Sequence, residues 1–297
     1  MMIEINYFIN VLIGGLVVGF IYALTALGIT IIYGILQIPD FSHGNRYMLG
    51  AYAGFLAASI AGNMLEISYI AAILAAVVVS ALVGILSYLF VYRKLLNAPH
   101  ITSFIAAIGL LMLLEGFALA VFGPRYQHIH TPFDYMVLIG ALRINAQRLV
   151  ILLSSIATIA LLFYFLRRTI TGIALEAVAQ SPVGARLVGI NTDKITLIAF
   201  AIAGALAGFA AALIAPITLV YPIMGAELNL KAFVICVVGG LGNIPGAIAG
   251  GLVLGIVESV YGGYFDIRWK NLVAFGILVA ILILKPEGLF GKRERRA

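Results

Sequence analysis

The sequence is poor in cysteine and in charge. Its single cysteine, Cys236, excludes a disulfide framework and a cysteine-based metal site within the chain. Only 10% of the 297 residues are charged and 63% are hydrophobic, whereas a soluble domain has about 25% charged and about 45–50% apolar residues. The composition therefore excludes a soluble domain and predicts a polytopic membrane protein.

Several chemical signatures are missing as well. The sequence has no G-x-x-x-x-G-K-[S/T] phosphate loop, so we expect no ATP bound in the usual way. Its four histidines, His43, His100, His128 and His130, are too dispersed to predict a metal site. No paired aspartates, Ser-Lys pair or His-x-x-x-His arrangement stands in an apolar run, which argues against an intramembrane enzyme. We thus expect no cofactor or metal bound by this chain.

The apolar runs have the length of membrane helices. A hydrocarbon core about 30 Å thick requires about 20 apolar residues per helix. The runs therefore predict an all-α bundle of about eight or nine membrane segments, in one transmembrane domain over residues 1–297. Small residues at four-residue spacing, such as Gly15 with Gly19 and Gly251 with Gly255, predict close helix packing. The predicted segments are 8–34, 47–62, 69–92, 101–122, 148–166, 194–215, 229–261 and 270–285.

The orientation follows from the basic residues and from one long segment. Segment 229–261 is too long for a single span, and its stretch GGLGNIPG at 239–246 favours a break. Basic residues collect at 93–94, at 167–168 and in the tail at 292–296, and such clusters favour the cytoplasmic side. All three clusters reach the cytoplasm only if the long segment crosses twice. The pattern therefore favours nine crossings and an external amino terminus, and it accounts for the net charge of +6 without a nucleic-acid partner.

The amino-terminal stretch MMIEINYF precedes the first apolar run and has neither Lys nor Arg. A removable signal peptide begins with a basic region. We therefore expect the first apolar segment to remain in the mature protein.

One water-compatible segment, residues 167–194, lies between apolar runs. Thr171 or Gly172 is expected to open a first short helix. The Ser-Pro pair at 181–182 supplies an N-cap and a first-turn proline for a second helix, and Gly189 is expected to end it. The segment therefore predicts a helix-turn-helix on the cytoplasmic face.

This predicted element leaves Glu176 and Arg186 exposed and has the shape of a docking element. The alternative is an amphipathic connector that binds only lipid headgroups. Residues 176–178 and 185–191 resemble the cytoplasmic coupling segment of permease subunits of ATP-binding-cassette importers, in particular the branched-chain amino acid permeases. Further stretches agree with that family in the same order and extend the resemblance over nearly the whole chain: 19–28 with 31–34, 41–44 with 48–52, and 231–233 with 239–247.

The resemblance implies a permease subunit in a bacterial or archaeal cytoplasmic membrane that passes branched-chain or similar neutral amino acids. It implies that two separate ATP-binding subunits carry ATP and Mg²⁺. It also implies a second related permease that completes the path and an extracytoplasmic binding protein that delivers the amino acid. The residues expected to couple to the ATP-binding subunits are Glu176, Ala177, Ala185, Arg186 and Gly189.

The polar connector at 38–46 is one candidate for the substrate path. The resembling family often reads Asn-Phe-Ala-His-Gly here, and this sequence has Asp40 and Ser42 in place of the Asn and the Ala. Two interpretations stay open. Either the connector contacts substrate, or an Asp40–Arg46 pair makes it structural. The candidate substrate-path residues are Ser42, His43 and Gly44.

The predicted break is the other candidate. Unwound backbone at membrane depth can hold the charged groups of an amino acid, and Val234, Ile235 and Val237 could form an apolar wall. The alternative is a plain corner between helices. The candidate residues in the break are Gly239, Gly240, Gly242 and Asn243.

Three charged residues stand inside apolar runs, where a charge costs about 2.5–3.5 kcal/mol on insertion scales. Lys231 follows Glu227 by four residues, which predicts an ion pair on one helix face. Glu258 is expected near a membrane interface. Glu115 is expected to form structural hydrogen bonds, with a role in proton or substrate movement as the alternative.

Two other functions remain open from the sequence. One is a self-sufficient carrier driven by protons or ions through Glu115 or Glu258. The other is the same ATP-driven machinery with urea or an amide as its substrate. The polar segment 167–194 favours the ATP-driven importer, because a self-sufficient carrier needs no docking site for an ATPase.

Overall fold

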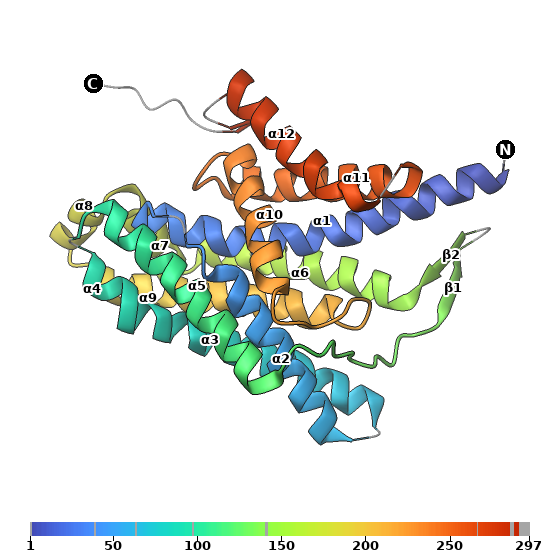
Figure 1. The fold of residues 1–297 in the computed structure, drawn as a ribbon. Helices are drawn as coiled ribbons and strands as arrows, with labels where there is room; N and C mark the ends of the chain where they lie inside the picture. Colours follow the sequence, from blue (N-terminus) through green and yellow to red (C-terminus); the bar gives the residue numbers. More distant parts are fainter. Residues whose placement is uncertain are drawn as a thin grey trace.

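The computed structural model describes residues 2–38, 40–62, 64–96, 98–139, 142–265, 267–285 and 288–290, and the basic tail at 292–296 lies outside the described residues. The protein is a bundle of helices with one short hairpin (Figure 1). The elements are α1 (Met2–Leu36), α2 (His43–Ala61), α3 (Leu65–Ser87), the π-helix η1 (Tyr88–Tyr92), α4 (Arg93–Leu95), α5 (His100–Phe122), β1 (Met136–Ile139), β2 (Leu142–Asn145), α6 (Ala146–Arg168), α7 (Ile170–Gln180), α8 (Pro182–Leu187), α9 (Thr192–Ile214), α10 (Met224–Gly239), α11 (Ile244–Tyr264), the 3₁₀-helix η2 (Ile267–Trp269) and α12 (Lys270–Leu284).

The described residues contain six helices that are long and apolar enough to cross a membrane. They belong to α1, α3 with its η1 and α4 extension, α5, α6, α9 and α11. α10 and α12 are apolar but shorter, and α2 carries polar residues in its first turn. The predicted fold class, a helical polytopic membrane protein, is therefore confirmed.

The bundle has two distinct ends. α7 and α8 lie at one end, and the first residues of α1 lie at the other together with the hairpin (Figure 1). The hairpin pairs β1 with β2 in antiparallel register, with Met136 opposite Asn145. An all-α prediction missed this element because each strand has only four residues. A backbone bridge between Gln127 and Val220 joins the connection between α5 and β1 to the connection between α9 and α10.

The start of α2 lies earlier than predicted. The segment expected at 47–62 begins at His43, and every residue from His43 to Ala51 is buried. These polar residues look like a loop in the sequence. They are helical because their side chains find partners inside the bundle, as described below.

The predicted break in segment 229–261 is present. α10 ends at Gly239 and α11 begins at Ile244, with positive φ values of 95° at Gly240 and 76° at Gly242. Such values favour glycine. The Asn243 side chain then caps α11 by accepting a hydrogen bond from the backbone N–H of Gly246. The long apolar region is therefore two helices.

α1 and α11 pack along each other through their predicted small residues. A Cβ atom at Gly255 would lie 2.4 Å from the Cα of Gly19, and one at Gly15 would lie 2.8 Å from the Cα of Ile256. α3 and α9 approach as closely, since a Cβ at Gly208 would lie 2.2 Å from the carbonyl oxygen of Ala76. Because lipid supplies no hydrophobic drive between helices, this backbone proximity provides the van der Waals contact.

We predict that Gly255→Val destabilises the chain by about 1–3 kcal/mol, the usual cost of overpacking. Gly116→Val on α5 is the matched control, because a Cβ there meets no described atom within 4 Å. The measurement is the thermal unfolding midpoint of each purified variant in detergent. Equal midpoints for the two variants would contradict the α1–α11 contact.

Candidate functional site

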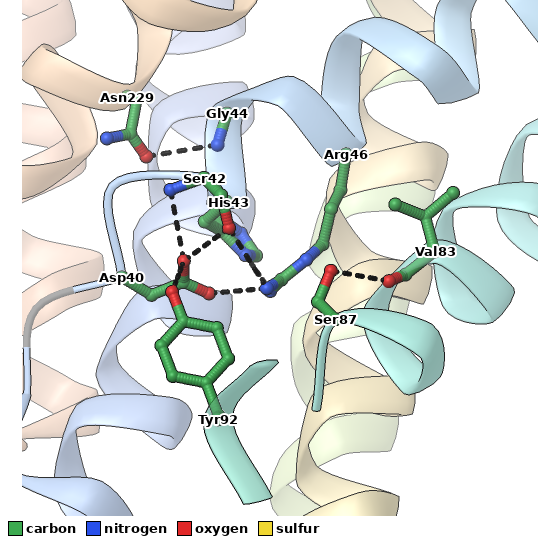
Figure 2. A network of polar contacts seen from close by, with 9 residues as sticks. All are labelled: Asp40, Ser42, His43, Gly44, Arg46, Val83, Ser87, Tyr92 and Asn229. Carbon is green, nitrogen blue, oxygen red and sulfur yellow. Dashed lines mark hydrogen bonds and ion pairs between the residues drawn. The ribbon is translucent and has the colours of Figure 1, made fainter. Parts of the chain in front are cut away.

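The connection between α1 and α2 turns back into the bundle. Gln37, just after α1, has a positive φ of 54°, an uncommon value for a residue other than glycine. Asp40 organises the turn that follows. Its Oδ1 atom accepts hydrogen bonds from the backbone N–H of Ser42 at 3.0 Å and from the Ser42 hydroxyl at 2.6 Å. The Tyr92 hydroxyl of η1 donates a third hydrogen bond to the same oxygen at 2.6 Å (Figure 2).

The predicted Asp40–Arg46 pair is present at the centre of this network (Figure 2). Nη2 of Arg46 lies 2.6 Å from Oδ2 of Asp40, and neither side chain is exposed. The guanidinium also lies over the Phe200 ring of α9, 5.1 Å from its centroid. The Ser80 hydroxyl of α3 donates to the backbone carbonyl of Arg46 at 2.8 Å. The start of α2 is thus bound to α3 and α9.

The first turns of α2 and α10 meet inside the bundle. The backbone N–H of Gly44 donates to the Asn229 side chain at 3.0 Å (Figure 2). A Cβ at Gly44 would lie 2.0 Å from the carbonyl oxygen of Gly225, so only glycine fits there. The His43 ring packs against Gly28 in the last third of α1. Two short helices therefore begin at interior positions rather than at an end of the bundle.

A second ion pair, largely buried, joins α10 to α11. Nζ of Lys231 lies 2.8 Å from Oε2 of Glu258, and their side chains are 11% and 6% exposed. The Tyr22 hydroxyl of α1 completes the group. It donates to the same Glu258 oxygen at 2.7 Å and accepts from Lys231 at 2.8 Å.

This contact corrects one sequence prediction. Lys231 pairs with Glu258 and not with Glu227, which instead accepts a hydrogen bond from the Tyr221 hydroxyl at 2.8 Å. Glu258 is buried within the bundle, and its expected position near a membrane interface stays a prediction. In the connection before α10, burial raises the pKa of the Tyr221 hydroxyl and the Glu227 carboxylate raises it further, so this hydroxyl remains a donor. Glu115 is partly exposed and makes no hydrogen bond or ion pair with the residues that the structure describes.

The Lys231–Glu258 pair lines a cavity of about 580 Å³ at the hairpin end of the bundle. Four tyrosines, an apolar wall and three further charged residues also line it. They are Tyr7, Tyr22, Tyr47 and Tyr221, then Val18, Ile21, Ile214, Met224 and Leu228, then Arg148, Glu227 and Lys270. The pair therefore faces a space that a small solute can occupy.

A second cavity, of about 710 Å³, lies at the α7 end. Gly242 and Asn243 of the predicted break line it, together with Arg167 and Glu176. Gly239 instead packs against the backbone of Gly246. Val234, Ile235 and Val237 do not line this cavity, and their role as an apolar wall for substrate stays a prediction. Among the described residues, no group of three or more His, Cys, Asp or Glu side chains could hold a metal ion.

Comparison with known proteins identifies the scaffold. A family model described as "branched-chain amino acid transport system / permease component" matches residues 11–282. The chain belongs to this family of permeases. It is 30% identical to the high-affinity branched-chain amino acid transport system permease protein LivH of Salmonella typhimurium, over 97% of each chain. It is 32% identical to the corresponding protein BraD of Pseudomonas aeruginosa, over 98% of each chain. A more distant relative is the ribose import permease protein RbsC of Escherichia coli, 28% identical over 88% of this chain and 81% of the relative.

The permease has the predicted helix-turn-helix at the end of α6. Thr169, and not Thr171 or Gly172, caps α7, since its hydroxyl accepts from the backbone N–H of Gly172. The predicted cap of α8 is present, because the Ser181 hydroxyl accepts from the N–H of Gly184. Gly189 follows α8 with a positive φ of 86°.

The surface of the α7–α8 helix-turn-helix differs in one respect from the prediction. Glu176 and Arg186 are exposed as expected, whereas Ala185 is 4% exposed and packs inward. Sequence reasoning missed the exposed apolar side chains of the tip. Val183, Leu187 and Val188 are 65%, 83% and 76% exposed. We define this apolar surface, formed by Val183, Leu187 and Val188, as the α8 tip.

The substrate-path residues of the permease fall into two places. Ser42, His43 and Gly44 lie in the buried network, where Ser42 supports the turn and Gly44 contacts α10. Gly242 and Asn243 line the cavity at the α7 end. Their contact with substrate stays a prediction. The structure separates both groups from the Lys231–Glu258 cavity.

We predict that Arg46→Met destabilises the permease by about 3–5 kcal/mol, because it leaves the buried Asp40 carboxylate without its counter-charge. The double variant Asp40→Asn/Arg46→Met removes both charges and should recover most of that loss. Thermal unfolding of both variants measures the difference. A double variant no more stable than Arg46→Met would show that the two charges do not stabilise each other.

Proposed function

We propose that this chain forms part of the translocation path of an ATP-driven importer for branched-chain or similar neutral amino acids. The observation that carries the proposal is the family match over residues 11–282 combined with the exposed α8 tip. We place the chain in the cytoplasmic membrane of a bacterium or archaeon, where its relatives' importers would work. It has no nucleotide-binding motif of its own, so ATP and Mg²⁺ are assigned to partner subunits.

The proposed partners follow from the same scaffold. Two ATP-binding subunits dock on the α8 tip, which offers apolar side chains flanked by the charged Glu176 and Arg186. Anchors of this kind, surrounded by polar residues, are the usual composition of a protein interface. A second permease, identical or related, completes the path. An extracytoplasmic binding protein delivers the amino acid at the opposite end.

We infer nine membrane crossings: α1, α2, α3, α5, α6, α9, α10, α11 and α12. The six long helices cross fully, and α2 and α10 are shorter because they begin inside the bundle where Gly44 meets Gly225. This count places the amino terminus and the hairpin outside, and α7 with α8 inside. It agrees with the basic pairs at 93–94 and 167–168, which then face the cytoplasm.

Transport would use alternating access. ATP-driven closure of the partner subunits would move α7 and α8, and α6 and α9 would carry that movement into the bundle. The comparisons favour this importer and lend no support to an ion-coupled carrier. They leave the solute open, since a ribose permease shares the scaffold, and urea and amides remain alternatives.

The function is tested by reconstituting the complete importer in proteoliposomes and measuring ATP-dependent uptake of leucine, other neutral amino acids, ribose and urea. We expect uptake of branched-chain amino acids. This uptake should require the binding protein, and it should require ATP on the side of the membrane that α8 faces. Uptake of ribose or urea without leucine uptake would replace the proposed substrate.

We predict that Leu187→Glu releases the ATP-binding subunits. Loss of an interface anchor costs about 2 kcal/mol or more, which is about a 30-fold loss of affinity. Leu138→Glu in β1 is the matched control, because Leu138 is 68% exposed at the opposite end of the bundle. Co-purification of the ATP-binding subunits with each variant is the measurement. Retention by Leu187→Glu at the level of the control would remove the α8 tip from the interface.

The orientation predicts which positions a membrane-impermeant maleimide reaches in intact cells. We expect Tyr126→Cys, 66% exposed on the hairpin side, to label without permeabilisation. Val183→Cys, 65% exposed on α8, should label only after permeabilisation. The native Cys236 is buried and serves as the unlabelled background. The reverse labelling pattern would invert the topology.

A further inference from the structure

We propose that Lys231 and Glu258 form a binding site for the zwitterionic head of the substrate amino acid. Glu258 takes the ammonium group, Lys231 takes the carboxylate, and the apolar wall of the 580 Å³ cavity takes the side chain. This inference rests on the proposed function, because it names where and how the permease recognises an amino acid.

The ion pair itself has unused binding capacity. Oε2 of Glu258 receives both the Tyr22 hydroxyl and the Lys231 ammonium, whereas Oε1 is buried and has no hydrogen-bond partner among the described residues. A lysine ammonium has three donors, and Lys231 uses one on Tyr22 and one on Glu258. One acceptor and one donor therefore remain side by side. These are the complements of an ammonium group and a carboxylate.

An unpaired carboxylate oxygen is costly to bury. Glu258 is only 6% exposed, so bulk water does not offset this cost by hydrogen bonding to Oε1. A substrate ammonium that reaches Oε1 would remove the cost, and it would do so when α10 and α11 shift enough to uncover that oxygen. The site thus favours a ligand that enters during the transport cycle over permanent occupation.

The cavity supplies the rest of the site. Val18 and Ile21 of α1, Ile214 of α9 and Leu228 of α10 give it an apolar wall beside the ion pair. Such a wall suits an aliphatic side chain and offers little to the hydroxyl groups of a sugar. A zwitterion also adds no net charge beside Lys231 and Glu258, whose two charges balance each other. Neutral urea or ribose has neither an ammonium group for Oε1 of Glu258 nor a carboxylate for the remaining donor of Lys231.

The Asp40–Arg46 ion pair lies in a different setting. The Asp40 and Arg46 side chains are fully buried, and neither residue lines either of the two cavities. Lys231 and Glu258 lie instead at the cavity on the hairpin side, where the binding protein would release the amino acid. Position and partial exposure separate the two pairs.

The test uses the complete importer in proteoliposomes with the binding protein, and measures leucine imported per ATP hydrolysed. We expect Glu258→Gln to lower this ratio about tenfold, because an amide holds an ammonium group far more weakly than a carboxylate does. ATP hydrolysis stimulated by the binding protein should continue. Cys236→Ala, a buried change on α10 outside the cavity, should keep the wild-type ratio.

The charge exchange Lys231→Glu/Glu258→Lys separates a binding role from a structural one. A structural pair tolerates exchange, so leucine import and thermal stability would recover together relative to Glu258→Gln. A binding site requires each charge at its own position, so import stays low whether or not stability recovers. Recovery of import by the exchange, or an unchanged ratio in Glu258→Gln, overturns the proposal.

Failure of the proposed function gives a different result. If the wild-type importer takes up ribose or urea and no amino acid, the function is wrong before any variant is compared. If the wild-type importer takes up leucine and the variants keep its ratio, the function stands and the zwitterion site is wrong.

Discussion

The fold depends on the need to neutralise the Asp40 and Arg46 charges inside the bundle. Neither side chain reaches solvent, so each charge is tolerable only beside the other. The pair holds the chain in a turn that returns into the interior after α1. That turn sets where α2 begins, and this start brings Gly44 to Asn229 of α10. The contact between two short helices at the centre thus follows from one ion pair.

The Asp40 carboxylate also takes part in contacts that lead from the centre of the bundle toward the α7–α8 end. Asp193, at the start of α9, accepts a hydrogen bond from Tyr88 at 2.5 Å and lies 2.9 Å from Arg93. Tyr88 belongs to the π-helix η1, and four residues later Tyr92 donates to Asp40. π-helical turns often stand at functional positions. The η1 turn therefore carries two polar contacts, one from Tyr88 to the start of α9 and one from Tyr92 to the turn that positions α2.

Features determined by neighbouring residues could be predicted from the sequence. The glycines and proline at 239–246 predicted the break, and Ser181 with Pro182 predicted the start of α8, because turns and caps depend on local backbone chemistry. The start of α2 at His43 could not be predicted, since its polar residues become helical only through partners on α1, α3, α9 and α10. The hairpin at 136–145 was missed because two four-residue strands gain their stability from pairing with each other.

The two ion pairs show where sequence reasoning about the site stops. Asp40 and Arg46 are six positions apart in one connector, and their pairing followed from that proximity. Glu227 places a carboxylate one helical turn from Lys231, and the four-residue spacing of the two therefore predicted that they pair. The fold instead brings Glu258 of the next helix to 2.8 Å, because α10 and α11 run side by side after the glycine break. Burial favours the pairing of Lys231 with Glu258. Glu227 lies near the connection that precedes α10 and accepts a hydrogen bond from a tyrosine hydroxyl. Lys231 lies deeper in α10 and needs a counter-charge that is equally desolvated. The break therefore does more than shorten a helix, since it creates the antiparallel neighbour that carries the carboxylate into the cavity.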